Sequence, residues 1–157
     1  MTDRTITLQM LQRSLGSVVR RTAIPRAHER IIRRAGVDID RVEAVALSRI
    51  TDAVSMTVTE LAGEMGVACS TAGRHAANLE EAGWVGRTPS PGDGRVTILT
   101  PTPEGTALIG RLREAHCSLL AEALSGWDTD DLAAIGDLLD RLGRDLLWLS
   151  QPAEIAT

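Results

Sequence analysis

Several residue types are absent from this chain of 157 residues or are rare in it. Lys, Phe and Tyr are absent, so all 17 basic residues are Arg. We interpret this bias as one of genome composition and not of function. Because aromatic residues make up only 2% of the chain, we do not expect a large pocket lined by aromatic side chains.

Long apolar segments and cysteines are also scarce. No apolar run approaches the roughly 18 residues of a membrane-spanning helix, and no signal-peptide pattern is present. We therefore expect a soluble, cytoplasmic protein without a membrane partner. The only cysteines are Cys69 and Cys117, which are too few for a disulfide framework, and Cys117 is expected in the core.

The charge of the chain is distributed unevenly around a net value of −4. This value disfavours a protein that coats nucleic acid through bulk charge. Residues 1–50 contain ten Arg and five acidic residues, whereas residues 104–157 contain four Arg and ten acidic residues. A surface that binds anions must therefore depend on a few well-placed Arg side chains.

Apolar residues at helical spacing predict two helices in the first fifty residues. The first is ended or kinked by Pro25 and stops at Gly36. The second follows Asp40, whose spacing to Glu43 is that of a capping box, and reaches Ile50.

The middle of the chain predicts a helix-turn-helix followed by a hairpin. Thr57 and Glu60 have the spacing of a capping box at the start of a short helix that ends at Gly66. A second helix is expected from about Ser70 to Ala82.

Two short strands are expected after this helix pair, at residues 84–85 and 96–99, with a turn rich in Pro and Gly between them. A helix-turn-helix followed directly by a hairpin is a winged helix.

The C-terminal part predicts two further helices. Thr102 caps the first, with Pro103 at its first helical position, and Asp128 or Thr129 caps the second. The second helix repeats apolar residues at heptad spacing: Leu132, Ile135, Leu139, Leu142, Leu146 and Leu149. Because apolar stripes occur at both ends of a small chain, we favour a homodimer interface over a helix packed on its own domain.

Residues 57 to about 108 resemble the winged-helix domain of the MarR (multiple-antibiotic-resistance regulator) family. The most specific match is Asp93-Gly94-Arg95, followed by a strand and Thr102-Pro103-Glu104-Gly105. The other matching residues are Thr59-Glu60-Leu61-Ala62, Gly66-Val67, Ser70-Thr71, Arg74, Leu79-Glu80, Gly83, Val85 and Arg87. The flanking helices are similar to the family's dimerisation helices in length and pattern.

This resemblance implies a mainly α fold with a small β wing, in which a winged helix-turn-helix is flanked by N- and C-terminal dimerisation helices. The expected division is residues 1–36 as an N-terminal dimerisation helix kinked near residue 25, residues 37–103 as the DNA-binding domain and residues 104–157 as C-terminal dimerisation helices. It implies a triangular homodimer that binds a pseudo-palindromic operator in double-stranded DNA, usually as a repressor released by a ligand.

The second helix of the helix-turn-helix carries most candidate DNA contacts. Ser70 and Thr71 lie in its first turn, where unsatisfied backbone N–H groups favour phosphate. Arg74, one turn later, could read guanine or bind phosphate, and Asn78 could read adenine or bind phosphate. Gly73 has two interpretations, a close approach to DNA or drift at an exposed site.

The wing carries the remaining candidate DNA contacts. Arg95 is expected to enter the minor groove, and Arg87 is expected to bind phosphate. The resemblance implies that Asp93 orients the wing through an ion pair with Arg74 or Arg95.

Three positions depart from the family pattern. Ala68 replaces a common capping Ser, so the recognition helix has a weaker cap. His75 replaces an apolar residue and is expected to be partly buried at the contact between helices. Pro101 replaces a common Leu and is expected to shorten the second wing strand.

The resemblance implies a ligand site between the dimerisation helices and the winged domain. Candidate effector-binding residues there are Arg13, Arg20 and His28, together with Trp127 and Trp148. The Arg-rich first helix favours a small anionic aromatic effector such as a phenolic carboxylate. The three His residues are scattered, so we expect no metal, and we expect no cofactor.

Two alternative functions remain open. One is a redox-responsive regulator in which oxidation of Cys69 places bulk against DNA; the other interpretation of Cys69 is a small buried residue. The second alternative is a winged-helix module that binds a protein instead of DNA, in keeping with the acidic middle and C-terminal segments. An enzyme is disfavoured, because the sequence offers no nucleophile–base arrangement, phosphate loop or carboxylate pair.

Overall fold

The computed structural model describes residues 3–22, 25–92 and 96–146. Within these residues the chain forms seven helices and three strands. In chain order they are α1 (Asp3–Thr22), α2 (Pro25–Ala35), α3 (Arg41–Ala53), β1 (Met56–Thr57), α4 (Val58–Met65), α5 (Cys69–Glu81), β2 (Val85–Pro89), β3 (Thr97–Pro101), α6 (Pro103–Ala123) and α7 (Thr129–Asp145). The expected mainly α fold with a small β wing is confirmed.

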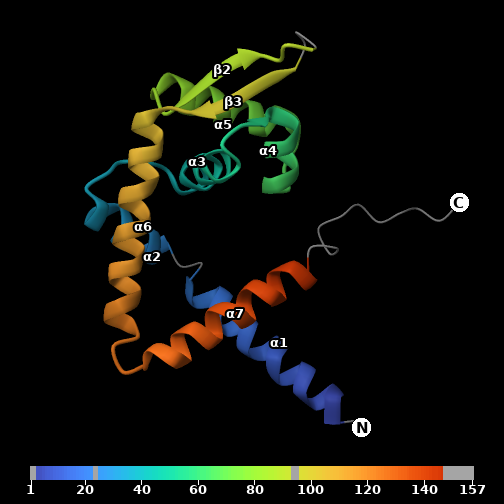
Figure 1. Cartoon of the computed structure of the whole chain (residues 1–157), viewed down its shortest axis with the longest axis vertical. Helices are drawn as coiled ribbons and strands as arrows, with labels where there is room; N and C mark the ends of the chain where they lie inside the picture. The colour runs from blue at the N-terminus through green and yellow to red at the C-terminus, as the bar shows by residue number, and fades with distance from the viewer. Residues whose placement is uncertain (1–2, 23–24, 93–95, 147–157) are drawn as a thin grey trace, which may run out of the picture.

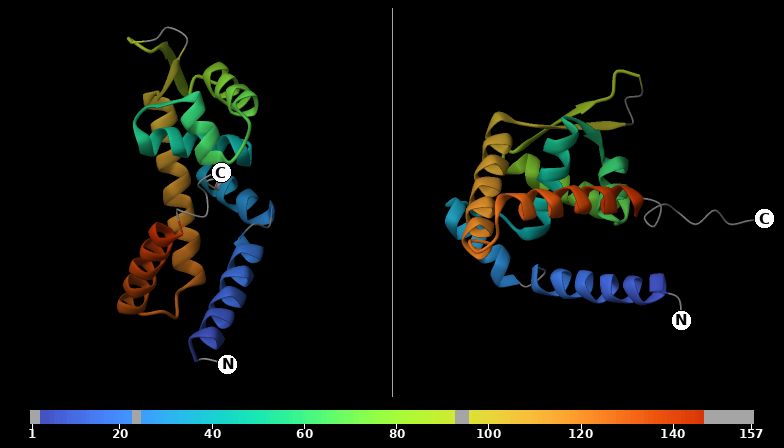
Figure 2. Two further views of the ribbon diagram at one scale, coloured as in Figure 1. Left: turned by 90° about the vertical axis from the view of Figure 1, so that its right-hand side faces the viewer. Right: turned by 60° about the horizontal axis from the view of Figure 1, so that its bottom comes forward.

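The long helix α6 connects two regions of the molecule (Figure 1). At its N-terminal end, α3, α4 and α5 pack together against the small sheet, and α2 lies alongside α6. At its other end lie α7 and α1, which the left view of Figure 2 also places away from the sheet. This arrangement separates a compact winged domain from two helices that pack little against it.

The winged domain contains the hydrophobic core. Its helices each contribute one apolar face, and the small side chains of Ala62, Ala72 and Ala76 let α4 and α5 pack closely. The largest fully buried side chains are Leu47, Ile50, Leu61, Leu79 and Leu99. This core holds α5 in a fixed orientation relative to the sheet.

The sheet is antiparallel, with strand order β1-β3-β2. Both wing strands run further than predicted, to Pro89 and Pro101, because Val85 pairs with Pro101 and Pro89 pairs with Thr97. The third strand, β1, was not predicted. It is only two residues long, and it pairs with Ile98 and Leu99, far along the chain.

The expectation that Pro101 shortens the second wing strand is wrong. Pro101 is the last residue of β3 and pairs with Val85. The flanking Thr102 N–H donates to the carbonyl of Trp84 at 3.0 Å, so the ladder hydrogen bond lies beside this pair and not within it. A missing N–H at Pro101 therefore removes no hydrogen bond from the ladder.

The predicted helix caps hold with one exception. The Thr57–Glu60 capping box is present at α4, Thr102 caps α6, and Asp128 caps α7. Asp40 caps α3 by accepting from the backbone N–H of Val42 at 2.8 Å. The prediction that Glu43 completes a capping box there is wrong, because its carboxylate accepts a hydrogen bond from α5 instead.

The break between the first two helices lies where the sequence predicts it. α1 ends at Thr22, and α2 begins at Pro25, the position at which proline is tolerated in a helix. α2 ends before Gly36, whose φ of +63° suits glycine. Arg34 of α2 then pairs with Glu122 of α6 at 2.6 Å.

The expectation that Cys117 lies in the core is wrong, and of the two interpretations of Cys69 the small buried residue does not hold. Cys69 and Cys117 are both exposed. Helical spacing places Cys117 on the face of α6 opposite Leu108, which is buried in the core. Cys69 begins α5 ahead of Ala72, the first buried residue of that helix.

Among the described residues, none of the helices combines the length and the apolar character that crossing a membrane requires.

Candidate nucleic-acid interface

The recognition helix α5 has a buried face and an exposed face. Ala72, Ala76 and Leu79 are buried, and helical spacing places Ser70 and Arg74 on the opposite side, where both are exposed. Among the described residues, Arg74 forms no ion pair. Its guanidinium is therefore available to an anion outside the chain.

The start of α5 matches the sequence prediction. Ala68 is the N-cap and makes no side-chain capping bond, as expected. The backbone N–H of Thr71 donates to the carbonyl of Ala68 at 2.9 Å, and the Thr71 side chain is half-buried. Ser70 is the exposed hydroxyl of this turn.

Gly73 lies toward α4 and not on the outer face of α5. A Cβ atom built there would lie 3.9 Å from Cγ1 of Val58, an ordinary van der Waals contact. Gly73 is half-buried, so the description of this position as an exposed site does not hold. The space around it accommodates a methyl group.

Two predicted DNA contacts already have acidic partners within the chain. Nδ2 of Asn78 donates to Oε1 of Glu43 at 2.7 Å, which connects α5 to α3. Nη1 of Arg87 donates to Oε2 of Glu80 at 3.4 Å, which connects β2 to α5. Sequence reasoning missed both carboxylates, since no local pattern pairs residues from different elements.

The other recognition-helix expectation concerns His75. It is half-buried, as expected, and its Nδ1 is buried without a hydrogen-bond partner among the described residues. Asp93 and Arg95, with the predicted ion pair of Asp93, lie outside the described residues, as do Trp148 and Leu149.

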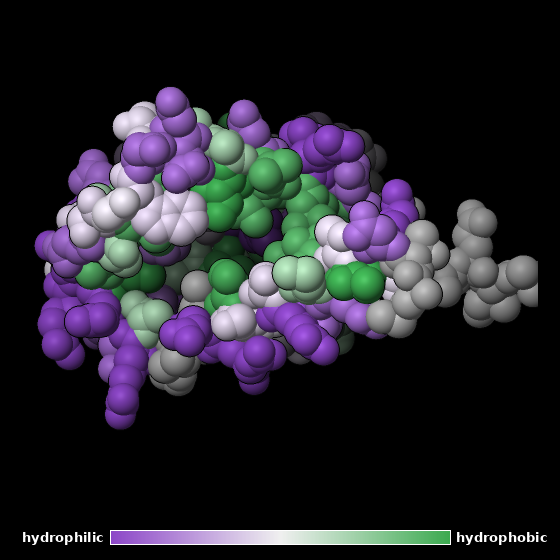
Figure 3. Space-filling view, turned by 90° about the horizontal axis from the view of Figure 1, so that it is seen from below, coloured by the Kyte–Doolittle hydropathy of each residue, from purple (hydrophilic) through white to green (hydrophobic). Residues whose placement is uncertain are grey.

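A second surface lies at the far end of the molecule, between α1 and α7. No residue of α7 is buried, and Leu138 has 64% of its surface exposed. The two helices border a groove of about 440 Å³, lined by Leu11, Ser14, Leu15, Val18, Ile135, Leu138, Leu139, Arg141, Leu142 and Asp145. Figure 3 views this side, where apolar side chains border a hollow.

A pocket lies where α2, α3 and α6 meet. Its volume is about 220 Å³, and its lining consists of His28, Ile31, Arg41, Ala44, Val45, Ser48, Ile109, Leu112, Arg113 and His116. Of the predicted effector residues that the structure describes, His28 alone lines this pocket, and its Nε2 lies 3.4 Å from the carbonyl oxygen of Ile39. Arg13 and Arg20 are exposed on α1, and Trp127 is exposed after α6.

In the described part of the chain, no three His, Cys, Asp or Glu side chains come close enough together to hold a metal ion.

The packed pair α4 and α5, followed by the β2–β3 wing, defines a winged helix-turn-helix protein, the class that places its second helix in a DNA major groove.

Comparisons with known proteins agree with this class. Residues 39–97 match the model of the MarR family. YxaD of Bacillus subtilis (strain 168), named an uncharacterized HTH-type transcriptional regulator, is 26% identical over 137 residues, which cover 87% of this chain and 93% of YxaD.

Solved structures share the whole fold. A MarR family protein from Bacillus stearothermophilus superposes with a TM-score of 0.72 at 24% identity, covering 93% of this chain and 98% of that chain. A mutant MarR from E. coli, complexed with operator DNA, has a TM-score of 0.63 at 22% identity and covers 90% of this chain and 99% of its own. The winged helix-turn-helix of this chain is therefore of the MarR type, and over most of its length the chain is similar to a helix-turn-helix transcriptional regulator.

Proposed function

We propose that this regulator binds a pseudo-palindromic operator as a homodimer and represses transcription until a small anionic effector releases it. The observation that carries the proposal is the exposed face of α5. Ser70 and Arg74 project from it, opposite the buried face, and Arg74 is not paired with any described residue. A hydroxyl and a guanidinium on one helix face suit a phosphate and a guanine edge.

The homodimer is supported by the surface between α1 and α7. Apolar side chains such as Leu11 and Leu139 face solvent there, at the end of the molecule away from the core. Exposed apolar area of this kind marks protein interfaces. A twofold dimer would present two copies of α5 to half-sites one helical turn apart.

The effector site is supported by the pocket between α2, α3 and α6. Its lining residues belong to α2, to α3 of the winged domain and to α6, the helix that precedes α7. His28 and Arg113 provide cationic or hydrogen-bonding groups beside the apolar side chains of Ile31 and Ile109. We propose a small aromatic carboxylate as the ligand of this pocket.

The experiment that tests the proposed function is selection of bound duplexes from a random DNA pool at a stated salt concentration. We expect the wild type to recover an inverted repeat and Arg74→Ala to lose it. Arg111→Ala is the matched control, since Arg111 is exposed on α6 and not on α5. Recovery of no sequence at low salt by a folded dimer would favour the protein-binding module instead.

The exposure of Cys69 favours a second candidate function, redox-responsive regulation. Oxidation of this thiol would place an added group at the start of α5, beside the DNA-facing residues. Peroxide should then abolish operator binding by the wild type but not by Cys69→Ser. Cys117→Ser is the matched control, because Cys117 is also exposed but lies on α6; equal protection by both variants would contradict this candidate.

A further inference from the structure

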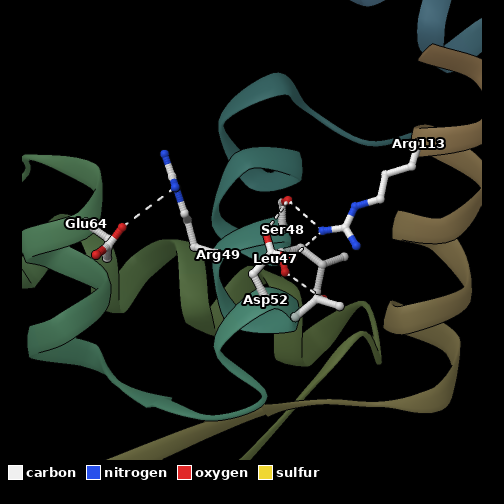
Figure 4. Close-up of polar contacts among 7 residues, drawn as sticks. Leu47, Ser48, Arg49, Asp52, Glu64 and Arg113 are labelled. Atoms are coloured by element: carbon white, nitrogen blue, oxygen red, sulfur yellow. Dashed lines mark hydrogen bonds and ion pairs between the residues drawn. The ribbon is translucent and has the colours of Figure 1, made fainter. Parts of the chain in front are cut away.

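Polar side chains join α3 to the helices that pack around it. Figure 4 shows two of these contacts, from Arg49 to Glu64 of α4 at 3.7 Å and from Arg113 of α6 to Asp52. A further contact leads to the recognition helix: Oε1 of Glu43 accepts a hydrogen bond from Nδ2 of Asn78 at 2.7 Å. Of these three contacts, the last is the one that involves α5.

The hydrogen bond to Glu43 fixes the orientation of the Asn78 amide. A carboxylate only accepts hydrogen bonds, so the nitrogen of the amide and not its oxygen must face Glu43. Glu43 is half-buried and lies in the first turn of α3, where the helix dipole favours a negative charge. The hydrogen bond is charge-assisted, and bonds of this kind are stronger than neutral ones. One of the two orientations that an exposed amide can adopt is therefore strongly preferred.

The oriented amide keeps one donor and one acceptor for a molecule outside the chain. Among the described residues, no second hydrogen bond of the Asn78 side chain is present, so Oδ1 and one N–H are left. Asn78 is exposed and follows Arg74 by four residues and Ser70 by eight, a spacing that places all three on one face of α5. The face that the proposed function turns toward DNA thus presents an amide of known orientation.

Adenine is the base whose major-groove edge matches this amide. It presents the N6 amino group as a donor beside N7 as an acceptor, and an asparagine side chain can pair with both at once. Guanine presents two acceptors, O6 and N7, which would leave Oδ1 of Asn78 unpaired. A phosphate likewise offers acceptors only, and it would also lie near the negative charge of Glu43.

We propose that Asn78 reads an adenine in each half-site and that Glu43 is the residue that positions it. The inference rests on the proposed function, in which α5 enters the major groove. Glu43 contributes by preorganisation, because an amide that is already oriented loses less freedom when it binds a base. Its negative charge has the opposite effect on DNA of any sequence, since it repels the phosphate backbone. Glu43 therefore increases discrimination between bases and decreases general affinity for DNA.

The test is selection of bound duplexes from a random pool, followed by titration of the selected operator and of a version with guanine in place of the adenine. We expect the wild type to prefer adenine at least about fivefold, the lower end of what a bidentate contact provides. Asn78→Ala should lose this preference and keep the rest of the inverted repeat. Glu43→Gln should lose about half of it or more, because a glutamine can both donate to Asn78 and accept from it, and so permits both amide orientations.

Binding of non-operator DNA gives a second readout, which a purely structural contact would not change. Glu43→Gln should bind such DNA more tightly than the wild type, since it removes a negative charge beside α5, while it discriminates less between bases. Glu81→Gln, at the last residue of α5, is the control for charge: it should also bind such DNA more tightly but keep the preference for adenine. Glu64→Gln is the control for helix contacts, because Glu64 also joins α3 to a neighbouring helix, and it should keep the preference for adenine.

Thermal unfolding checks that each variant folds, with Asn78→Ser replacing Asn78→Ala if the latter does not. Two results would overturn the inference alone: an operator with no position at which Asn78→Ala changes the base preference, or a full preference for adenine in Glu43→Gln. A uniform loss of affinity for all sequences in Asn78→Ala would assign this side chain to phosphate and overturn it as well. If the wild type recovers no inverted repeat, the proposed function fails too, so the two failures are distinguishable.

Discussion

At the scale of single residues, the start of α6 depends on one close contact. A Cβ atom on Gly105 would lie 2.1 Å from the carbonyl oxygen of Trp84, so only glycine fits. Thr102 secures the same joint: its hydroxyl accepts from the backbone N–H of Gly105 at 3.0 Å and donates to the carbonyl of Gly83 at 2.8 Å. These contacts fix the direction in which α6 leaves the wing, and in the proposed dimer they would help to set the distance between the two winged domains.

Gly105→Ala should destabilise the protein by at least about 2 kcal/mol, because the backbone of Trp84 cannot move without disturbing β2. Gly110→Ala is the matched control on the same helix. Nothing lies within 4 Å of a Cβ atom there, so we expect a gain of up to about 1 kcal/mol from helix propensity. Urea unfolding measures both, and a Gly105→Ala variant as stable as the wild type would contradict the contact.

Gly73→Ala should stabilise the protein by about 1 kcal/mol, since alanine favours the helix and its Cβ meets Val58 at an ordinary distance. Because Gly73 lies toward α4, operator affinity should stay within about twofold of the wild type. Thermal unfolding and a DNA-binding titration measure the two effects. A large loss of affinity without loss of stability would show instead that DNA approaches this glycine closely.

At the scale of elements, a capping box decides where α4, the first helix of the helix-turn-helix, begins. Oε2 of Glu60 accepts from the backbone N–H of Thr57 at 2.7 Å and from its hydroxyl at 2.9 Å. These two hydrogen bonds, the backbone one first, lower the pKa of Glu60 below its ordinary value of 4.5. The carboxylate form is therefore the one that holds the start of α4 against β1.

The lowered pKa of Glu60 predicts the sign of a pH effect. A group with a depressed folded-state pKa contributes stability above its ordinary pKa and loses it as the pH falls through the folded-state value. The stability advantage of the wild type over Glu60→Gln should therefore shrink as the pH is lowered through and below 4.5. Urea midpoints across this range measure it, with Glu114→Gln, on α6, as the control. An advantage that grows with acidity would contradict the cap.

The elements that the sequence predicts well are those with local signals. Thr57 and Thr102 each cap a helix through a hydrogen bond to a backbone N–H three residues later, so the sequence pattern that predicts them is short. The break before Pro25 is predicted by a single residue, because proline is favoured in the first turn of a helix. The sequence did not predict β1, because a strand of two residues carries no periodic pattern.

In the candidate DNA-binding site, too, the features that depend on local sequence were predicted and those that depend on tertiary packing were not. Helical spacing alone placed Arg74 on the outward face of α5, because the period is a local property. The partnership of Asn78 with Glu43 spans 35 residues and depends on how α3 packs against α5. Contacts of this kind become visible only when the fold is known.

At the scale of the whole molecule, the winged domain has a hydrophobic core of its own, whereas α1 and α7 leave apolar side chains exposed to solvent. The core lies among α3, α4, α5, the sheet and the first half of α6, while α1 and α7 expose apolar side chains along a shared groove. A second copy that covers these helices would bury that surface and fix the spacing of two recognition helices. The proposed dimer is therefore the assembly that makes operator recognition possible.

Leu138→Glu should raise the dimer dissociation constant at least about 30-fold, the effect of losing roughly 2 kcal/mol at an interface hot spot. The variant should still fold, because Leu138 lies outside the core of its own protomer. Val42→Glu is the matched control: Val42 is also exposed, but on α3. Analytical ultracentrifugation measures the constant.

Dissociation of the dimer by Leu138→Glu should also lower the affinity for operator, since a single protomer binds only one half-site. Salt separates the two steps: raising it should weaken DNA binding steeply, because phosphate contacts release counterions, while an apolar interface persists. A Leu138→Glu protein that stays dimeric and binds operator as tightly as the wild type would place the interface elsewhere.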